Sequence, residues 1–141
     1  MNAAYYPYSS IDLSDGVTEC RGAWLHRYTR DGVTVLAIGG QIDACNADQI
    51  REHAHRYASA SAALVVDMTQ VEFFSVQGLR NLMSFGERCR KAGVEWVLVG
   101  SRSVHRLLRV ADVDRALPIA QSTDAALQRF AGRTTECLES A

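Results

Sequence analysis

The sequence predicts an α/β domain built on a mostly parallel sheet with an antiparallel edge at its N-terminal side. Short apolar runs with the length of buried strands alternate along the chain with segments of helical period. This pattern is typical of parallel strands joined by covering helices. Ahead of these segments, Asp31-Gly32 separates two strand-like stretches. It predicts a tight hairpin, which pairs its two strands antiparallel.

The hairpin and the first helix form the first part of this predicted domain. Residues 23–29 alternate in character, and Val33–Ile38 is so apolar that we expect burial on both faces, in the interior of the sheet. Asn46 is followed three residues later by Gln49, which resembles a capping box with Asn in place of Ser or Thr. We therefore expect a helix from this point to about Tyr57.

The centre of the chain is a predicted strand-to-helix turn. Ala63–Met68 reads as a buried strand, and the turn Val71–Leu79 follows it. Ser75 is a natural N-cap, because its hydroxyl can accept a hydrogen bond from the first turn of a helix. Val76 would then be the first helical residue, near the surface. The helix should end at Gly93, since glycine is the usual residue at a helix stop.

The same alternation continues to the end of the chain. Residues 94–99 read as a buried strand, and Ser101 or Ser103 caps a short helix after it. Residues 117–119 read as a brief last strand, and a final helix starts at Thr123. The sequence thus predicts five strands and about four helices.

Length and composition indicate one domain. The chain has 141 residues, of which 48% are hydrophobic, and its net charge is −1. We divide it into an N-terminal extension at 1–20 with an aromatic cluster at Tyr5–Tyr8, a domain at 21–131 and a frayed C-terminal tail at 132–141. The charge balance gives no attraction to nucleic acid or anionic membranes. Since the sequence also lacks a signal peptide and a membrane-length apolar run, we expect a cytoplasmic protein.

The residues that could carry chemistry do not form a recognisable catalytic or metal site. His53 and His55 would point to nearly opposite sides of a helix and cannot chelate one ion. Ser75 lies in Phe-Ser-Val-Gln-Gly, which is not the G-x-S-x-G of a nucleophilic serine. Asp67 lacks the acidic pair and the lysine that accompany a phosphate-accepting aspartate, so a turn or capping role is expected. We therefore expect no enzymatic activity, no metal and no cofactor.

Among the cysteines, Cys45 allows two interpretations, an inert thiol or a redox-active one. The four cysteines are scattered and form no CxxC pair, so they are expected to remain thiols in a reducing compartment. Cys89 falls on the apolar face of its helix and should be packed. Cys45 lies near a helix N-terminus, which can lower a thiol pKa. A redox role for Cys45 therefore stays open beside that of an inert loop thiol.

Two motifs together resemble the STAS domain of bacterial anti-sigma-factor antagonists. They are Gly40–Asp43 and Phe73–Leu79, with a strand ending near Asp67 between them, and the match extends from about Ala23 to Phe130. The resemblance implies a four- to five-stranded sheet with helices and no catalytic activity. It also implies binding to an anti-sigma factor, often a serine kinase, which frees a sigma factor for transcription. The kinase switches such antagonists off by phosphorylating a serine at the start of the central helix.

The sequence departs from the family where the switch is expected. The usual turn reads Phe-x-Asp-Ser-Ser/Thr-Gly-Leu, and here Ser75 takes the Asp position, Val76 the phosphorylated Ser position and Gln77 the second hydroxyl position. Valine cannot carry a phosphate, so the resemblance implies a preserved docking surface without the usual switch. A phosphosite shifted to Ser75 is the alternative. The expected partner-binding residues are Asp43, Cys45, Asn46, Ser75, Val76, Gln77, Gly78 and Leu79.

Two classes of function stay open. The first is an antagonist of a kinase-like anti-sigma factor, a monomer or weak dimer that is constitutive or controlled by something other than serine phosphorylation. The second is a STAS-like module that binds a small ligand or nucleotide, or a soluble subunit of a transport or stress-signalling complex. Gly39-Gly40 gives only a weak signal for a phosphate-binding loop, because it equally marks the end of a strand.

Overall fold

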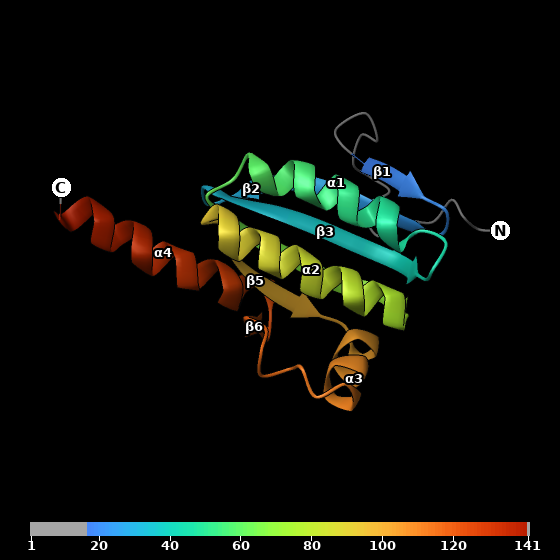
Figure 1. The fold of residues 1–141 in the computed structure, drawn as a ribbon. Coiled ribbons are helices and arrows are strands. Elements are labelled where there is room, and N and C mark those ends of the chain that lie inside the picture. Colours follow the sequence, from blue (N-terminus) through green and yellow to red (C-terminus); the bar gives the residue numbers. More distant parts are fainter. Residues whose placement is uncertain (1–16, 141) are drawn as a thin grey trace.

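The computed structural model describes residues 17–140, with side chains described for residues 17–131. Figure 1 shows one sheet in the order β1-β2-β3-β4-β5-β6 with helices packed against it. The first three strands are antiparallel, and β3, β4, β5 and β6 are parallel. The strands are β1 (Val17–Cys20), β2 (Ala23–Arg30), β3 (Val33–Ile42), β4 (Ala63–Phe74), β5 (Glu95–Gly100) and β6 (Ile119–Ala120); the helices are α1 (Ala47–Ser59), α2 (Val76–Ala92), α3 (Arg102–Val110) and α4 (Thr123–Ser140).

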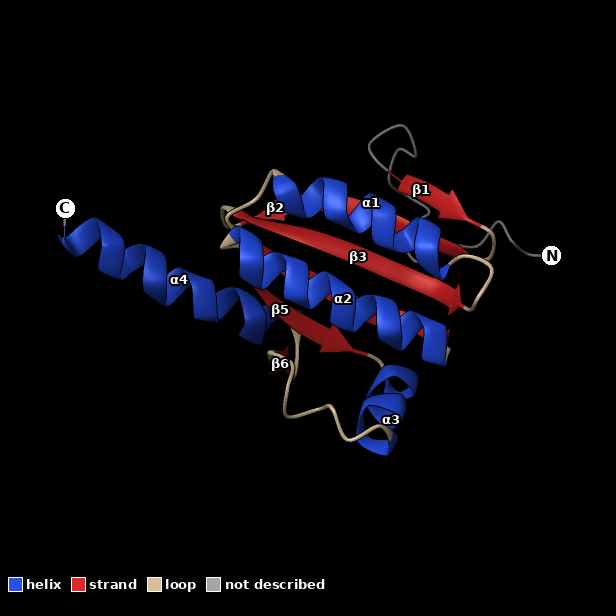
Figure 2. Ribbon diagram, in the orientation of Figure 1, coloured by secondary structure: helices blue, strands red, loops and turns tan. Residues whose placement is uncertain are grey.

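The sheet separates two apolar layers. Alternate residues of a strand point to opposite faces, so Leu64 and Val66 of β4 pack in one layer and Val65 packs in the other. Helices α1, α2 and α3 contribute to the first layer, and α4 contributes Ala126, Leu127 and Phe130 to the second. Figure 2 shows α1 and α2 side by side across one face of the sheet. The central strands are therefore buried on both faces, as their apolar composition predicts.

The predicted fold class is confirmed, with three differences at its boundaries. The sheet has six strands in the described chain, because Val17–Cys20 pairs with β2 where the sequence predicts a weakly structured extension. Strand β4 continues six residues past Met68, so Val71–Phe74 is strand and not turn. Helix α4 runs to Ser140, where a frayed tail was expected from Gly132. The aromatic cluster Tyr5–Tyr8 lies outside the described residues, and the division of the chain at 20 and 131 stays a prediction.

The helix caps and the helix stop predicted from neighbouring residues are confirmed for α2 and α3. The Ser75 hydroxyl accepts a hydrogen bond from the Gly78 amide at 3.1 Å and caps α2, while Ser101 caps α3 in the same way. Gly93 ends α2 with a left-handed backbone at φ 74°. None of the described helices is long and apolar enough to cross a membrane.

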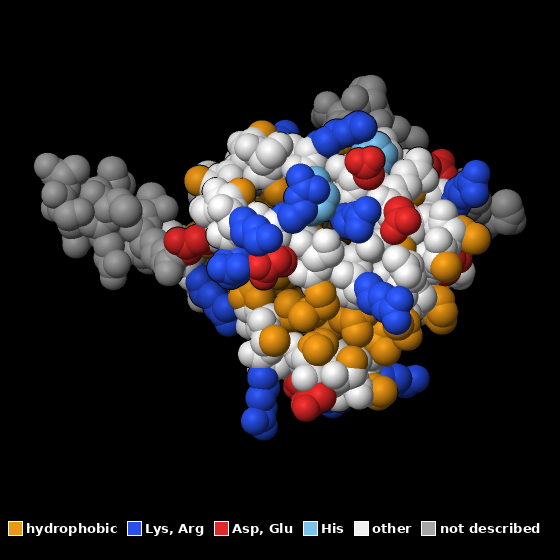
Figure 3. Space-filling view, viewed as in Figure 1, with side chains coloured by type: hydrophobic (Ala, Val, Ile, Leu, Met, Phe, Trp, Pro, Cys, Tyr) orange, Lys and Arg blue, Asp and Glu red, His pale blue; other side chains and the backbone are white. Residues whose placement is uncertain are grey.

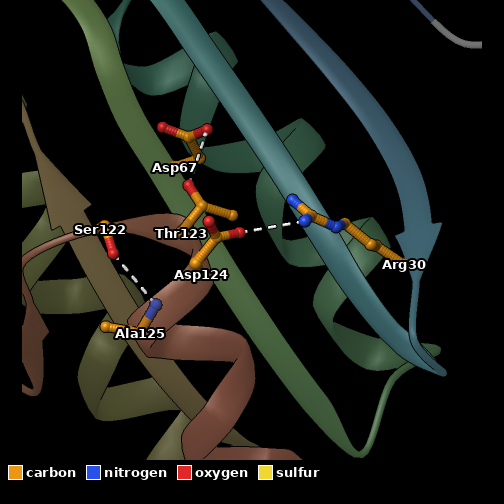
Figure 4. Close-up of polar contacts among 6 residues, drawn as sticks. All are labelled: Arg30, Asp67, Ser122, Thr123, Asp124 and Ala125. Atoms are coloured by element: carbon orange, nitrogen blue, oxygen red, sulfur yellow. Dashed lines mark hydrogen bonds and ion pairs between the residues drawn. The ribbon is translucent and has the colours of Figure 1, made fainter.

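Asp67 anchors the start of α4 to the sheet. It is buried within β4, where one carboxylate oxygen accepts hydrogen bonds from the Thr69 amide and hydroxyl. The other oxygen accepts from the Thr123 hydroxyl at 3.3 Å, and Asp124 forms an exposed ion pair with Arg30 of β2 (Figure 4). Asp67 lies inside β4, so the predicted turn or capping role is wrong. Its bond to Thr123 is a tertiary contact between residues 56 positions apart.

The turn between β1 and β2 lies directly against the end of β3. Gly40 has φ +92°, and a Cβ built there would lie 2.3 Å from the Gly22 carbonyl oxygen. That oxygen accepts a hydrogen bond from the Gln41 amide at 2.9 Å. The close approach of the two backbones therefore leaves no room for a side chain at Gly40.

Replacing Gly40 with Ala should lower the free energy of unfolding by more than about 2 kcal/mol, since it adds a steric clash to the cost of a positive φ. Gly93→Ala is the matched control, because its φ of +74° is similar but a Cβ there meets nothing within 4 Å. The control should lose only about 1 kcal/mol. Guanidinium unfolding of both variants measures the difference, and equal losses would contradict the close-approach argument.

Candidate functional site

The two motifs meet at the carboxyl ends of β3 and β4. Ile42 pairs with Phe74 in the parallel register, and the Ser75 amide donates a hydrogen bond to the Ile42 carbonyl at 3.0 Å. The loop that follows β3 and the first turn of α2 are therefore neighbours, as the sequence predicts. Open α/β folds place their binding sites at this edge of the sheet.

The start of α2 presents apolar side chains to solvent. Val76 is 56% exposed, and Phe73 at the end of β4 is 52% exposed. Phe73 is missing from the predicted site because the sequence predicts a turn over Val71–Leu79. Strand alternation alone would not have predicted the exposure of Phe73. The register shifts between Gly40 and Gln41, so Phe73 is exposed although Val71, two residues earlier, is buried.

Gly78 and Leu79 are both predicted to bind the partner, and in the isolated domain both are buried. Their contact with a partner stays a prediction. Leu79 is 7% exposed. A Cβ at Gly78 would lie 2.9 Å from both Ile42 and Phe74, so only glycine allows the helix to pack this closely. These residues hold the first turn against the sheet. Of the predicted residues in this helix, Val76 points into solvent, while Gln77 and Ser75 are half-buried.

The Asp43 loop is ordered by its own hydrogen bonds. One carboxylate oxygen of Asp43 accepts from the Cys45 amide at 2.9 Å, and its carbonyl accepts from the Ala47 amide at 3.0 Å. Asp43 therefore orders the turn that precedes α1, while Asn46 occupies the N-cap position of that helix. Cys45 is exposed beside it.

Asn46 is buried and supports the loop from beneath. It has no exposed surface, and its side chain makes no capping hydrogen bond, so the predicted capping box is wrong. Its amide nitrogen instead donates to the carbonyl oxygens of Cys20, Arg21 and Gln41 at 2.8–3.1 Å. Its side-chain oxygen accepts from the Asp43 amide at 3.0 Å. One side chain thus joins the β1–β2 turn, the end of β3 and the loop.

The cysteines differ in access. Burial raises the pKa of the Cys20 thiol, with a smaller contribution from the Glu19 carboxylate. Burial also raises the pKa of Cys89 to about 11. Both thiols are therefore protonated at neutral pH and packed, as predicted for Cys89. The redox role of the exposed Cys45 stays a prediction.

The helices above the sheet enclose little empty space. Asn81 of α2 donates to Asp48 at 2.9 Å and accepts from Arg51 at 3.2 Å, which ties α2 to α1. The apolar cavity beneath them is about 40 Å³. Sites for drug-sized ligands are about 300–1,000 Å³, so this cavity gives no support to a nucleotide between the helices. Among residues 17–131, no cluster of His, Cys, Asp and Glu side chains could hold a metal ion.

Comparison with known proteins identifies the fold family. The STAS domain model matches residues 25–126. The chain belongs to the STAS domain family. This includes bacterial anti-sigma-factor antagonists, and the predicted resemblance is confirmed.

Two relatives and one solved structure show this similarity. Osmosensory protein A of Mycobacterium tuberculosis is 35% identical over 114 residues, which cover 78% of this STAS protein and 72% of the relative. Anti-sigma-F factor antagonist RsfA of the same species is 30% identical over 101 residues, covering 69% and 79%. The crystal structure of an anti-sigma factor antagonist from Mycobacterium paratuberculosis superposes with a TM-score of 0.68 at 24% identity, covering 84% and 97%.

Replacing Asn46 with Asp should destabilise this STAS domain by at least about 2 kcal/mol, because a buried carboxylate would face three carbonyl oxygens that have lost their donor. Asp43→Asn is the reverse isosteric change on the half-buried neighbour, and its side-chain oxygen still accepts from the Cys45 amide. We expect a change below about 1 kcal/mol for this control. Guanidinium unfolding compares the two, and a small effect at Asn46 would show that the buried amide is not the support described.

Proposed function

We propose that this STAS protein is an anti-sigma-factor antagonist that binds a kinase-like anti-sigma factor and so releases a sigma factor for transcription. The observation that carries the proposal is the exposed apolar pair Phe73 and Val76 beside the Asp43 loop. The relatives named anti-sigma-F factor antagonists support the class of partner. The proposal includes a cytoplasmic location and no catalytic activity, cofactor, nucleic-acid partner or membrane partner.

The chemistry of the edge suits a protein partner. Phe73, Val76 and Val110 are the large hydrophobic side chains that lie exposed in the described part of the chain, and two of these three lie at this edge. Burying a Val or Phe side chain contributes about 1.5–3 kcal/mol. The half-buried Asp43 and Gln77 beside them provide polar groups for the rim of such an interface. Gly78 and Leu79 fix this surface by packing behind it.

The proposed antagonist is not controlled by phosphorylation at the usual position. Val76 has no hydroxyl, and it occupies the exposed first position of α2. The Ser75 hydroxyl serves as the helix cap, which gives that serine a structural role without phosphorylation. Binding is therefore constitutive or controlled by another signal, of which oxidation of the exposed Cys45 is one hypothesis.

A second function has one observation in its favour. The relative named Osmosensory protein A favours a component of a stress-signalling complex. The same exposed edge would serve in that complex, with a different partner. A pull-down from the source cell distinguishes the two, because the first function requires an anti-sigma factor in the recovered complex.

Replacing Val76 with Glu should weaken binding to the anti-sigma factor at least about tenfold, because the carboxylate would be desolvated at the interface near Asp43. The free energy of unfolding should change by no more than about 1 kcal/mol, since an anion is favourable at a helix N-terminus. Val110→Glu is the matched control, a valine 77% exposed at the far end of α3. Titration against the partner, with a thermal melt, measures both. If Val76→Glu binds like the parent, this edge is not the docking surface.

Incubation with the kinase-like anti-sigma factor and ATP should leave the parent protein without phosphate at residues 75 and 76. Val76→Ser restores a hydroxyl at the exposed first helical position, where the phosphate would meet the helix N-terminus. We expect this variant to gain one phosphate at that position. Mass spectrometry maps the modified residue. Stoichiometric phosphate on Ser75 of the parent would overturn the proposed absence of control.

A further inference from the structure

An apolar groove runs beside α2, away from the Asp43 loop. It lies between α2, β5 and the segment that leads to β6, and its volume is about 400 Å³. Figure 3 shows hydrophobic side chains gathered in a band along this side of α2. Trp96 forms part of the floor where Gly86 leaves space, since a Cβ at Gly86 would lie 2.8 Å from the indole. Leu117 and Pro118 line the opposite side.

A helical stripe borders this groove and carries charges in a particular order. We define the α2 stripe as the residues at spacings of three and four that reach the outer surface of α2: Val76, Arg80, Met83, Glu87 and Arg90. Met83 also packs against the core with part of its side chain. Arg80 and Glu87 are exposed on either side of the half-buried Met83. Seven residues of helix separate the two charges, which corresponds to about 10 Å along the axis.

We propose that a second copy of this chain docks on the α2 stripe, with the two α2 helices antiparallel about a two-fold axis near Met83. A two-fold axis pairs the same surface on both copies, so it must be self-complementary. With Met83 near the axis, Arg80 of each copy meets Glu87 of the partner subunit. The apolar groove beside the stripe is then covered by the helix of the other copy. One arrangement therefore forms both Arg80–Glu87 pairs and covers the apolar groove.

The existing ion pair of Glu87 does not compete strongly with this arrangement. Glu87 pairs with Arg90 within the same helix, and both side chains are at least half exposed. Exposed pairs of this kind add little to stability. Arg90 donates to both carboxylate oxygens of Glu87, but each oxygen has a second lone pair, so Glu87 can accept from an additional cation of the second copy. Met83 at the centre suits a contact between two helices because its unbranched side chain adapts to its neighbours.

The arrangement has a consequence for partner binding. Val76 lies two turns before Met83, so in an antiparallel pair it is covered by the second half of the other α2. A dimer would thus hide the docking edge described above. This consequence rests on the proposed function, whereas the dimer itself does not.

Charge reversal tests the proposal on the full chain. The parent should show concentration-dependent dimerisation by sedimentation between about 5 and 500 µM. Arg80→Glu and Glu87→Arg should each weaken self-association at least about tenfold, because two attractions become two repulsions. An equimolar mixture of the two variants should associate again, since every cross-pair between different variants is attractive. Arg56→Glu reverses an exposed charge on α1 and should leave association unchanged.

Several outcomes overturn the proposal. A parent that stays monomeric throughout this range removes the dimer. A dimer insensitive to both reversals, or a mixture that does not associate better than its components, removes the antiparallel α2 contact. Thermal melts confirm that each variant is folded. Failure of the anti-sigma factor to bind, with the charge-reversal pattern intact, would refute the proposed function and leave the dimer standing.

Discussion

The parallel pairing of β3 with β4 through to Ile42 and Phe74 is the constraint on which the candidate site depends. It brings two loops that are about thirty residues apart to the same edge, and it determines where α2 begins. The Ser75 amide completes the ladder by bonding to Ile42, so the helix starts directly from the strand. Gly78 then lets the first turn pack on the residues that end both strands. The place of Val76 at the start of α2 and its exposure to solvent both follow from this pairing.

The sequence predicted features whose cause lies within a few residues. The hairpin at Asp31-Gly32, the caps at Ser75 and Ser101 and the stop at Gly93 are of this kind, because each depends on local hydrogen bonds or on backbone conformation. The buried character of the central strands was predictable for a related reason. Their apolar runs have no alternation, and this marks burial on both faces.

The features that sequence reasoning missed depend on residues distant in the chain. The Asn46 amide bonds to Cys20 and Arg21, about 25 positions away, and no local pattern separates this role from a helix cap. Strand β4 extends past Met68 because β3 offers it a partner there, which again is a tertiary effect. The candidate site shows the same division. The predicted partner-binding residues include buried residues that pack behind the ends of β3 and β4, such as Leu79, together with side chains that reach solvent, such as Val76.

The hydrogen bonds of Asn46 also bear on where this domain begins. The family match starts at residue 25, after the turn that supplies two of the three carbonyl oxygens to the Asn46 amide. A fragment cut at the start of the match would retain every residue of both motifs, yet it would leave a buried amide without two of its acceptors. The Gly22 carbonyl that holds Gln41 would be lost with them. For this fold, the stretch that can be recognised by similarity is shorter than the stretch that keeps the Asp43 loop in shape, and truncation should be planned from the hydrogen bonds.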